Sequence, residues 1–194
     1  MKTQPLILAS SSPYRKQLLE KLGFDFICAA PDIDEKMRAN ESAKSLALRL
    51  AHEKAQALAV RYPTQLIIAS DQVAILDNQQ LEKPGTPANA IQQLQNSSGK
   101  IVDFHTSICV LNSATQEIKS SIDLCRVHFK TLSQQEIINY VQREQPYDCA
   151  GSFKSEGLGI ALFERIEGDD PNALIGLPLI QLITLLNAFG ISVL

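Results

Sequence analysis

Apolar residues recur along the chain with two periods, and the first half of the sequence contains both. The short apolar runs at residues 6–9 and 66–70 predict buried strands. Leucines and alanines at helical spacing predict helices over 13–22 and 42–62, each opened by a serine and followed by a glycine or a proline. A weakly alternating stretch at 24–30 predicts a further strand.

The second half begins with a helix that opens at Thr86 and continues with two long alternating segments. Residues 101–110 and 118–129 are separated by a short polar turn, which predicts a hairpin. Helices over 133–144 and 179–189 follow, and a capping box opens the first of them. Strands and helices that alternate around a mid-chain hairpin predict an α/β fold, with a mixed, twisted β-sheet flanked by helices.

Length and composition limit the choice of architecture and partner. A chain of 194 residues with 45% apolar content suits one domain over residues 1–194, with enough material for two lobes. The net charge of −3 and the absence of a Lys/Arg run argue against a nucleic-acid surface. Four separated cysteines without a C-x-x-C pair are typical of a reduced, cytoplasmic protein. The longest apolar region, 177–186, is too short to span a membrane, and no signal peptide is predicted.

The stretch from Leu6 to Arg15 joins a strand, three serines and the start of a helix. Ser12 is a suitable N-cap and Pro13 suits the first helical position. A helix N-terminus directly after a strand offers N–H groups and a positive dipole end to a phosphate. The ordinary alternative is a capped strand–helix junction without a ligand, and this stretch alone does not decide between the two.

Lys54 interrupts the apolar stripe of the helix over 42–62. At about 100° per residue, its side chain projects between those of Ala47 and Leu50. A buried ammonium group is costly unless it meets an anion, whereas a snorkelling lysine buries its stem and keeps its charge in water. Both interpretations remain open at this point.

Charged residues gather at the ends of predicted elements. Asp71 follows the buried run 66–70 and is expected at the carboxyl end of that strand, where α/β sheets bind ligands. The cations of this set are Arg15, Lys54 and Lys83, and the carboxylates are Asp34, Glu35, Asp71 and Glu156. Cations that hold a polyphosphate, with carboxylates that bind a divalent metal and activate water, suit hydrolysis of a phosphate ester or anhydride.

Other common catalytic signatures are missing from the sequence. It contains no G-x-x-x-x-G-K-[ST] loop, no G-x-G-x-x-G and no G-x-S-x-G elbow. The three histidines, His52, His105 and His128, are not spaced as metal ligands. The set of charged residues at element ends is therefore the main chemical signal.

Motifs along almost the whole chain resemble those of the Maf-like nucleotide pyrophosphatases. They are Leu8-Ala-Ser-Ser-Ser-Pro-Tyr-Arg15, Asp34-Glu35, Glu53-Lys54-Ala55, Ser70-Asp71-Gln72, Lys83-Pro84, Ala150-Gly-Ser152, and Asp170-Pro-Asn172 with Gly176-Leu-Pro178. Each motif is weak alone, but their order and spacing together form a strong signal.

This resemblance implies a two-lobed Maf/ITPase-like fold with a central cleft. It also implies a cytoplasmic hydrolase that uses Mg²⁺ or Mn²⁺ to split nucleoside triphosphates into monophosphate and pyrophosphate. Asp71 would then be the catalytic base, and Glu35 and Asp71 the metal ligands. The implied phosphate- and metal-binding residues are Ser10, Arg15, Glu35, Lys54 and Lys83.

Three positions distinguish branches of this family that act on different bases. The branch that acts on dTTP and UTP typically has Arg, Thr and Gln where this chain has Tyr14, Gln72 and Glu156. Gln72 and Glu156 resemble the branch that hydrolyses 7-methyl-GTP, which usually has Trp at the position of Tyr14. Methylation at N7 makes guanine cationic, so a Glu156 carboxylate would balance its charge and a Tyr14 ring would stack on it. The ordinary alternative for Glu156 is a loop charge beside Lys154.

The leading hypothesis is therefore a house-cleaning 7-methyl-GTP pyrophosphatase, with other modified nucleotides as further candidate substrates. One alternative is a dTTP/UTP pyrophosphatase of the same family, and another is a non-catalytic nucleotide-binding regulator of septum formation. The expected partner is a nucleoside triphosphate, whereas nucleic acid and membrane are not expected. A homodimer is expected from base rates alone.

Overall fold

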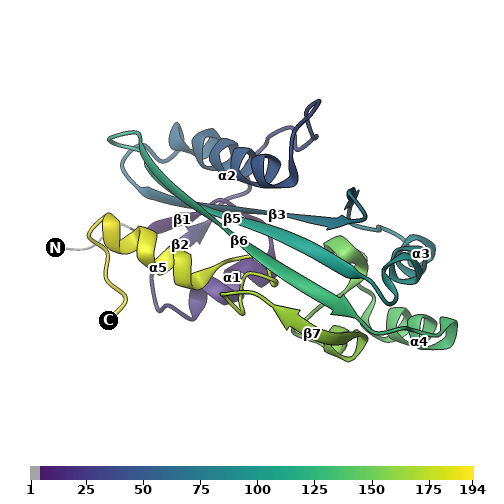
Figure 1. Ribbon diagram of the computed structural model, residues 1–194. Helices are drawn as coiled ribbons and strands as arrows, with labels where there is room; N and C mark the ends of the chain where they lie inside the picture. Colours follow the sequence, from purple (N-terminus) through teal and green to yellow (C-terminus); the bar gives the residue numbers. More distant parts are fainter. Residues whose placement is uncertain (1–4) are drawn as a thin grey trace. The chain divides into compact units, whose positions relative to one another are not determined.

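The computed structural model describes residues 5–194 and has a mixed α/β fold (Figure 1). Its strands are β1 (Leu6–Leu8), β2 (Phe26–Cys28), β3 (Leu66–Leu76), β4 (Gln79–Leu81), β5 (Ile101–Asn112), β6 (Glu117–Phe129) and β7 (Phe163–Glu167). Its α-helices are α1 (Pro13–Glu20), α2 (Ala43–Ala59), α3 (Pro87–Ser97), α4 (Gln134–Glu144) and α5 (Leu179–Ala188). Two short 3₁₀ helices are η1 (Ala150–Ser152) and η2 (Leu158–Leu162).

The strands form a single sheet in the order β2-β1-β3-β5-β6-β7, and β4 pairs with β3. β1 runs parallel to both β2 and β3. The β3–β4 and β6–β7 pairs are antiparallel. The mixed sheet predicted from the sequence is therefore confirmed.

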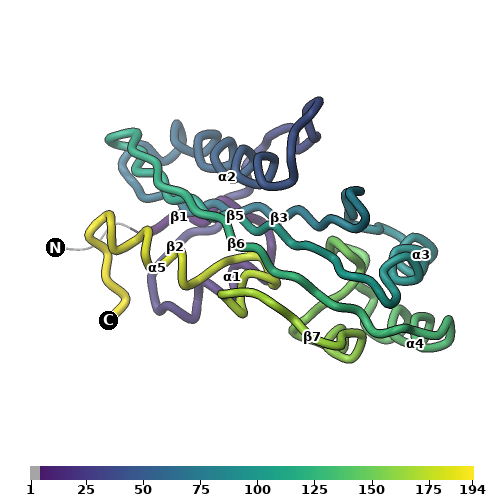
Figure 2. The backbone as a smooth tube through the Cα atoms, viewed as in Figure 1, coloured from purple at the N-terminus to yellow at the C-terminus, as the bar shows by residue number. Residues whose placement is uncertain are grey.

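The chain divides into two compact units. Unit 1 contains the chain up to Asp71 together with Thr106–Asp123 and Asp170–Leu194. Unit 2 contains Gln72–His105 and Leu124–Asp169. The long strands β3, β5 and β6, which can be followed in Figure 2, contribute residues to both units.

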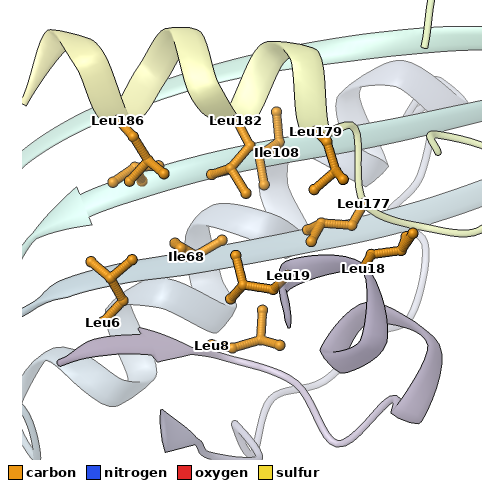
Figure 3. Packing of buried hydrophobic residues seen from close by; sticks show 11 residues of the cluster. Leu6, Leu8, Leu18, Leu19, Ile68, Ile108, Leu177, Leu179, Leu182 and Leu186 are labelled. Carbon is orange, nitrogen blue, oxygen red and sulfur yellow. The ribbon is translucent and has the colours of Figure 1, made fainter. Parts of the chain in front are cut away.

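The core of unit 1 lies on both faces of its part of the sheet. Successive side chains of a strand point to opposite faces. Leu6 and Leu8 of β1 therefore pack with leucines of α1 and α5 (Figure 3), whereas Ile7 and Ala9 pack with Ala51, Ala55 and Leu58 of α2. Because helices cover both faces, the strands of this unit carry apolar residues on both sides.

The core of unit 2 contains a cluster of aromatic rings. Phe153 contacts three other phenylalanines edge-on, with ring centroids 4.7–5.7 Å apart. The cluster consists of Phe104, Phe129, Phe153 and Phe163. Edge-to-face pairs add about 0.5–1.5 kcal/mol each beyond burial. The cluster thus fixes Phe153, three residues before Glu156 in the chain.

The helix starts are where the sequence predicts them. The side chains of Ser12, Ser42, Thr86 and Ser133 each accept the backbone N–H of the residue three positions later. The capping box at Ser133 is also present. Two helix ends differ slightly from the prediction. α1 stops two residues before its predicted end and α2 stops three residues before its own. Caps depend on neighbouring residues, so a local sequence pattern identifies them.

β7 was not predicted from the sequence. Only Phe163 of its five residues is buried, and Ile166, the other apolar residue, is exposed. Without alternation between apolar and polar residues, the stretch carries no strand signal. β7 exists because its backbone pairs with β6, which is a tertiary contact.

α5 is rich in leucine and packs Leu179, Leu182 and Leu186 into the core of unit 1. Its ten residues are far fewer than a bilayer requires. Within the described residues, no helix is long and apolar enough to cross a membrane.

Candidate functional site

The junction between β1 and α1 uses its own serines to bind its backbone N–H groups. Ser10 is buried, and its Oγ accepts the N–H of Ser12 at 3.1 Å. The Oγ of Ser12 accepts the N–H of Arg15 at 3.4 Å, and Pro13 has no N–H. The backbone cradle expected for a phosphate is thus partly filled by the chain itself, and the Arg15 side chain becomes the stronger candidate for phosphate binding.

Arg15 is fixed by a backbone carbonyl distant in the sequence. Its Nε donates a hydrogen bond to the Gly176 carbonyl oxygen at 2.8 Å. Burial lowers the pKa of the Arg15 guanidinium, and the carboxylates of Asp71 and Glu35 act in the opposite direction. A guanidinium has five N–H donors, so this bond orients the group while most of its donors remain for an anion.

Lys54 lies between two carboxylates. Its Nζ is 2.5 Å from Asp71 Oδ1 and 2.7 Å from Glu35 Oε1. Lys54 is 6% exposed and Asp71 is 7% exposed, whereas the Glu35 side chain is 60% exposed. Of the two interpretations of Lys54, the buried ammonium that meets an anion is the one present. The snorkelling interpretation is wrong, because the Lys54 ammonium forms ion pairs and does not reach water.

The position of Asp71 corrects the sequence interpretation. Asp71 lies in the middle of β3 and not at its carboxyl end. The neighbouring parallel strand β1 ends at Leu8, which is paired with Ile68. Asp71 therefore stands three residues beyond the carboxyl end of β1. Its N–H donates to Ser107 Oγ at 3.1 Å, so β3 continues past the end of β1 with side-chain support.

Ser70 and Gly176 contact the candidate site, although the sequence motifs do not predict them as site residues. The hydroxyl of Ser70, directly before Asp71, donates to the Gly176 carbonyl oxygen at 2.8 Å. The same oxygen accepts the Nε of Arg15. Both residues occur in motifs quoted for the family resemblance, but a contact across 106 residues of sequence leaves no local signal.

Ser10, Tyr14, Arg15, Glu35, Lys54 and Asp71 all belong to unit 1. Ion pairs bring Glu35, Lys54 and Asp71 together, and Arg15 lies close enough for the charges of Asp71 and Glu35 to act on its guanidinium. Tyr14 is half-buried in the first turn of α1, next to Arg15.

Gln72, Lys83 and Glu156 belong to unit 2. Gln72 is half-buried in β3, directly after Asp71. Lys83 is exposed in the loop after β4, and Glu156 is exposed in the loop between η1 and η2.

The loop that carries Glu156 is anchored by α4. On one side of Glu156, the N–H of Lys154 donates to the Tyr140 hydroxyl at 3.0 Å. On the other side, the N–H of Leu158 donates to Glu144 Oε2 at 2.8 Å. Lys154 Nζ donates to the Glu144 carbonyl oxygen at 3.1 Å, so Lys154 has its own partner on α4. Glu156 is therefore an exposed carboxylate on a loop held at both ends.

The carboxylate oxygens of Glu35 and Asp71 are suitable ligands for a hard divalent cation. Mg²⁺ binds through oxygen ligands and often uses only one or two protein carboxylates together with substrate phosphates. Both carboxylates contact the same Lys54 ammonium, so they lie near one another. No group of three or more His, Cys, Asp or Glu side chains suited to a metal occurs in the part of the chain that the structure describes.

A family model and a known sequence that resemble this chain agree on its family. The family model described as Maf-like protein matches residues 5–189. A 7-methyl-GTP pyrophosphatase of Colwellia psychrerythraea (strain 34H / ATCC BAA-681) is 53% identical over 194 residues, covering 100% of this chain and 96% of the relative. The Ham1 protein of Staphylococcus aureus is a solved structure with a TM-score of 0.48 and 15% identity, covering 80% of this chain and 90% of that chain. Because the family model spans nearly the whole sequence, the chain belongs to the Maf-like family, as its motifs predict.

Proposed function

We propose that the protein hydrolyses the α–β phosphoanhydride of 7-methyl-GTP to the nucleoside monophosphate and pyrophosphate. The main structural support for this reaction is the buried ion pair between the Asp71 carboxylate and the Lys54 ammonium, 2.5 Å apart. The relative that is 53% identical over the whole chain is named for this activity. Membership of the Maf-like family agrees with a nucleotide pyrophosphatase.

In this proposal Asp71 is the general base. Its carboxylate takes a proton from water, the water oxygen bonds to the α-phosphorus, and the bond from that phosphorus to the bridging oxygen breaks. Lys54 forms a buried ion pair with Asp71 and so holds its carboxylate in place. Arg15 takes up negative charge on the phosphates and the leaving pyrophosphate. Ser10 and Lys83 are further phosphate-binding residues in the proposal.

The carboxylate oxygens of Glu35 and Asp71 would hold Mg²⁺ or Mn²⁺, which when bound would neutralise charge on the polyphosphate. Glu35 is suited to this role because its side chain is largely exposed and can exchange Lys54 for another cation. Loss of activity in a chelator and its return with Mg²⁺ would test this part of the proposal separately.

Recognition of the base rests on charge and stacking. Glu156 supplies a carboxylate that accepts from the guanine ring N–H and amine and balances the charge added by N7 methylation. Tyr14 supplies an aromatic face for a cationic ring, a contact of about 0.5–2 kcal/mol. Gln72, beside Asp71, completes the proposed specificity set. A nucleotide substrate of this kind also agrees with the cytoplasmic location expected from the sequence.

The test measures pyrophosphate release with Mg²⁺ from 7-methyl-GTP, GTP, dTTP and UTP. Wild-type protein should act fastest on 7-methyl-GTP, and Asp71→Asn should lower kcat by about 10²–10⁴-fold. Asp25→Asn makes the same chemical change at an exposed position and should leave kcat unchanged. Undiminished release by Asp71→Asn would exclude the mechanism. Faster turnover of dTTP or UTP would exclude the assigned branch, and nucleotide binding without any turnover would favour the regulator of septum formation.

A further inference from the structure

The turn between β7 and α5 is built on one buried carboxylate. Asp170 is 1% exposed. Its Oδ2 accepts the N–H of Ile180 at 2.6 Å, and its Oδ1 accepts the N–H and Nδ2 of Asn172 at 2.8 and 3.0 Å. α5 has Pro178 at its N-cap and no side-chain cap of its own there. Asp170 therefore ties the beginning of the turn to the first residues of α5.

The rest of the turn is held by hydrogen bonds to its backbone carbonyl groups. The Asn172 carbonyl oxygen accepts the N–H groups of Ile175 and Gly176 at 3.1 and 3.2 Å. Thr106 Oγ1 of β5 donates to the Ala173 carbonyl oxygen at 3.0 Å. Hydrogen bonds hold both ends and the middle of the turn. The position of Gly176 is therefore determined by Asp170 together with the bonds to the Asn172 and Ala173 carbonyl groups.

Gly176 presents one carbonyl oxygen to two residues of the proposed active site. That oxygen accepts Arg15 Nε and Ser70 Oγ, both at 2.8 Å. Gly176 has a φ of +118°, which disfavours any residue with a side chain. A Cβ there would also meet Arg15 Nε at 3.3 Å. The position thus suits glycine alone, and its carbonyl links the arginine to the residue beside the proposed base.

We propose that Asp170 is a positioning residue for phosphate binding, which acts through the Gly176 carbonyl on Arg15 and on the strand at Asp71. This proposal rests on the proposed function. Asp170→Asn keeps the shape of the side chain but places an NH₂ group against N–H donors, so the turn must shift. A shift near 1 Å at a group that binds the transition state can cost about 10²-fold in rate.

The test compares Asp170→Asn with Asp169→Asn, which removes the same charge at an exposed neighbouring position. Two quantities are measured: kcat/KM for 7-methyl-GTP, and the affinity for inorganic pyrophosphate by calorimetry. Both should fall about tenfold or more in Asp170→Asn, at a temperature where circular dichroism shows a folded protein, and neither should change in Asp169→Asn.

A double-mutant cycle with Arg15→Lys separates positioning from a general loss of stability. If Asp170 acts through Arg15, then Asp170→Asn should cost much less in the Arg15→Lys background than in wild type. Equal losses in both backgrounds would overturn the proposal. If Asp170→Asn does not fold, Ser70→Ala tests the same Gly176 carbonyl, because it removes one of its two donors. Unchanged pyrophosphate affinity in Ser70→Ala would then overturn the proposal.

The outcomes keep the two proposals apart. Wild-type protein that neither hydrolyses a nucleoside triphosphate nor binds pyrophosphate would overturn the proposed function. Active wild-type protein with an equally active, equally tight-binding Asp170→Asn variant would overturn only the positioning role.

Discussion

The Lys54 ammonium lies 2.5 Å from the Asp71 carboxylate, and both side chains are buried. The pair joins the middle of α2 to the middle of β3, within unit 1. Each charge is tolerated inside the protein because the other compensates it. Removing one partner should therefore have a larger effect than removing an ordinary surface ion pair.

Lys54→Met should destabilise the protein and abolish most of its activity. The variant leaves the buried Asp71 carboxylate without its cation, which costs about 3 kcal/mol in comparable cases. Urea unfolding measures the loss. Lys44→Met, at an exposed position of the same helix, is the matched control and should be nearly neutral.

A second variant assigns this loss of stability to the charge of Asp71. In Lys54→Met/Asp71→Asn a neutral amide replaces the carboxylate, so the double variant should be more stable than Lys54→Met alone. A double variant that is less stable would contradict the electrostatic explanation.

Glu156→Gln should change substrate choice more than stability. The side chain is exposed, so its loss has little effect on folding, but a charge-assisted contact to a cationic base becomes a neutral one. The ratio of kcat/KM for 7-methyl-GTP to that for GTP should fall about tenfold, the equivalent of 1.4 kcal/mol. Glu164→Gln, also exposed, should leave the ratio unchanged. An unaltered ratio in Glu156→Gln would argue that Glu156 is only a loop charge.

Stability should decrease in acid partly through Glu41. The hydrogen bonds from Arg49 and from the N–H of Arg38 lower the pKa of Glu41 from its ordinary value of 4.5 to about 2. A carboxylate with a lowered folded-state pKa stabilises the protein above its unfolded-state pKa, and this contribution is lost as pH falls from 4.5 toward 2. Wild type should be more stable than Glu41→Gln at about pH 6, and the two should converge near about pH 2. A constant difference across this range would contradict the assignment.

The four cysteines should react with a thiol reagent in two classes. Cys28 is exposed and Cys149 is half-buried, whereas Cys109 and Cys125 are buried. Burial raises the pKa of the Cys109 thiol to about 12, so it is neutral as well as inaccessible. Native protein should label at Cys28 first, and Cys109 and Cys125 should label only in denaturant. Rapid labelling of Cys109 in native protein would contradict the packing between α2 and the sheet.

The sequence by itself determined the features that depend on near neighbours. The caps at Ser12, Ser42, Thr86 and Ser133 bond to residues three positions away, so a short motif contains all the chemistry involved. The apolar stripe of α2 likewise placed Lys54 on the buried side of its helix. The family motifs predict the residues of the candidate site, but a motif does not state what a side chain touches.

Only the tertiary structure decided which groups meet. Lys54 finds its anions in Asp71, 17 residues away, and in Glu35, on a loop without regular structure. Asp71 lies within β3, which continues beside β5 past the end of β1, and its N–H donates to Ser107 Oγ of β5. Arg15 is oriented by Gly176, 161 residues later in the chain. Periodicity and capping report on contacts within one element, whereas these contacts arise when separate elements pack together, and no local pattern encodes them.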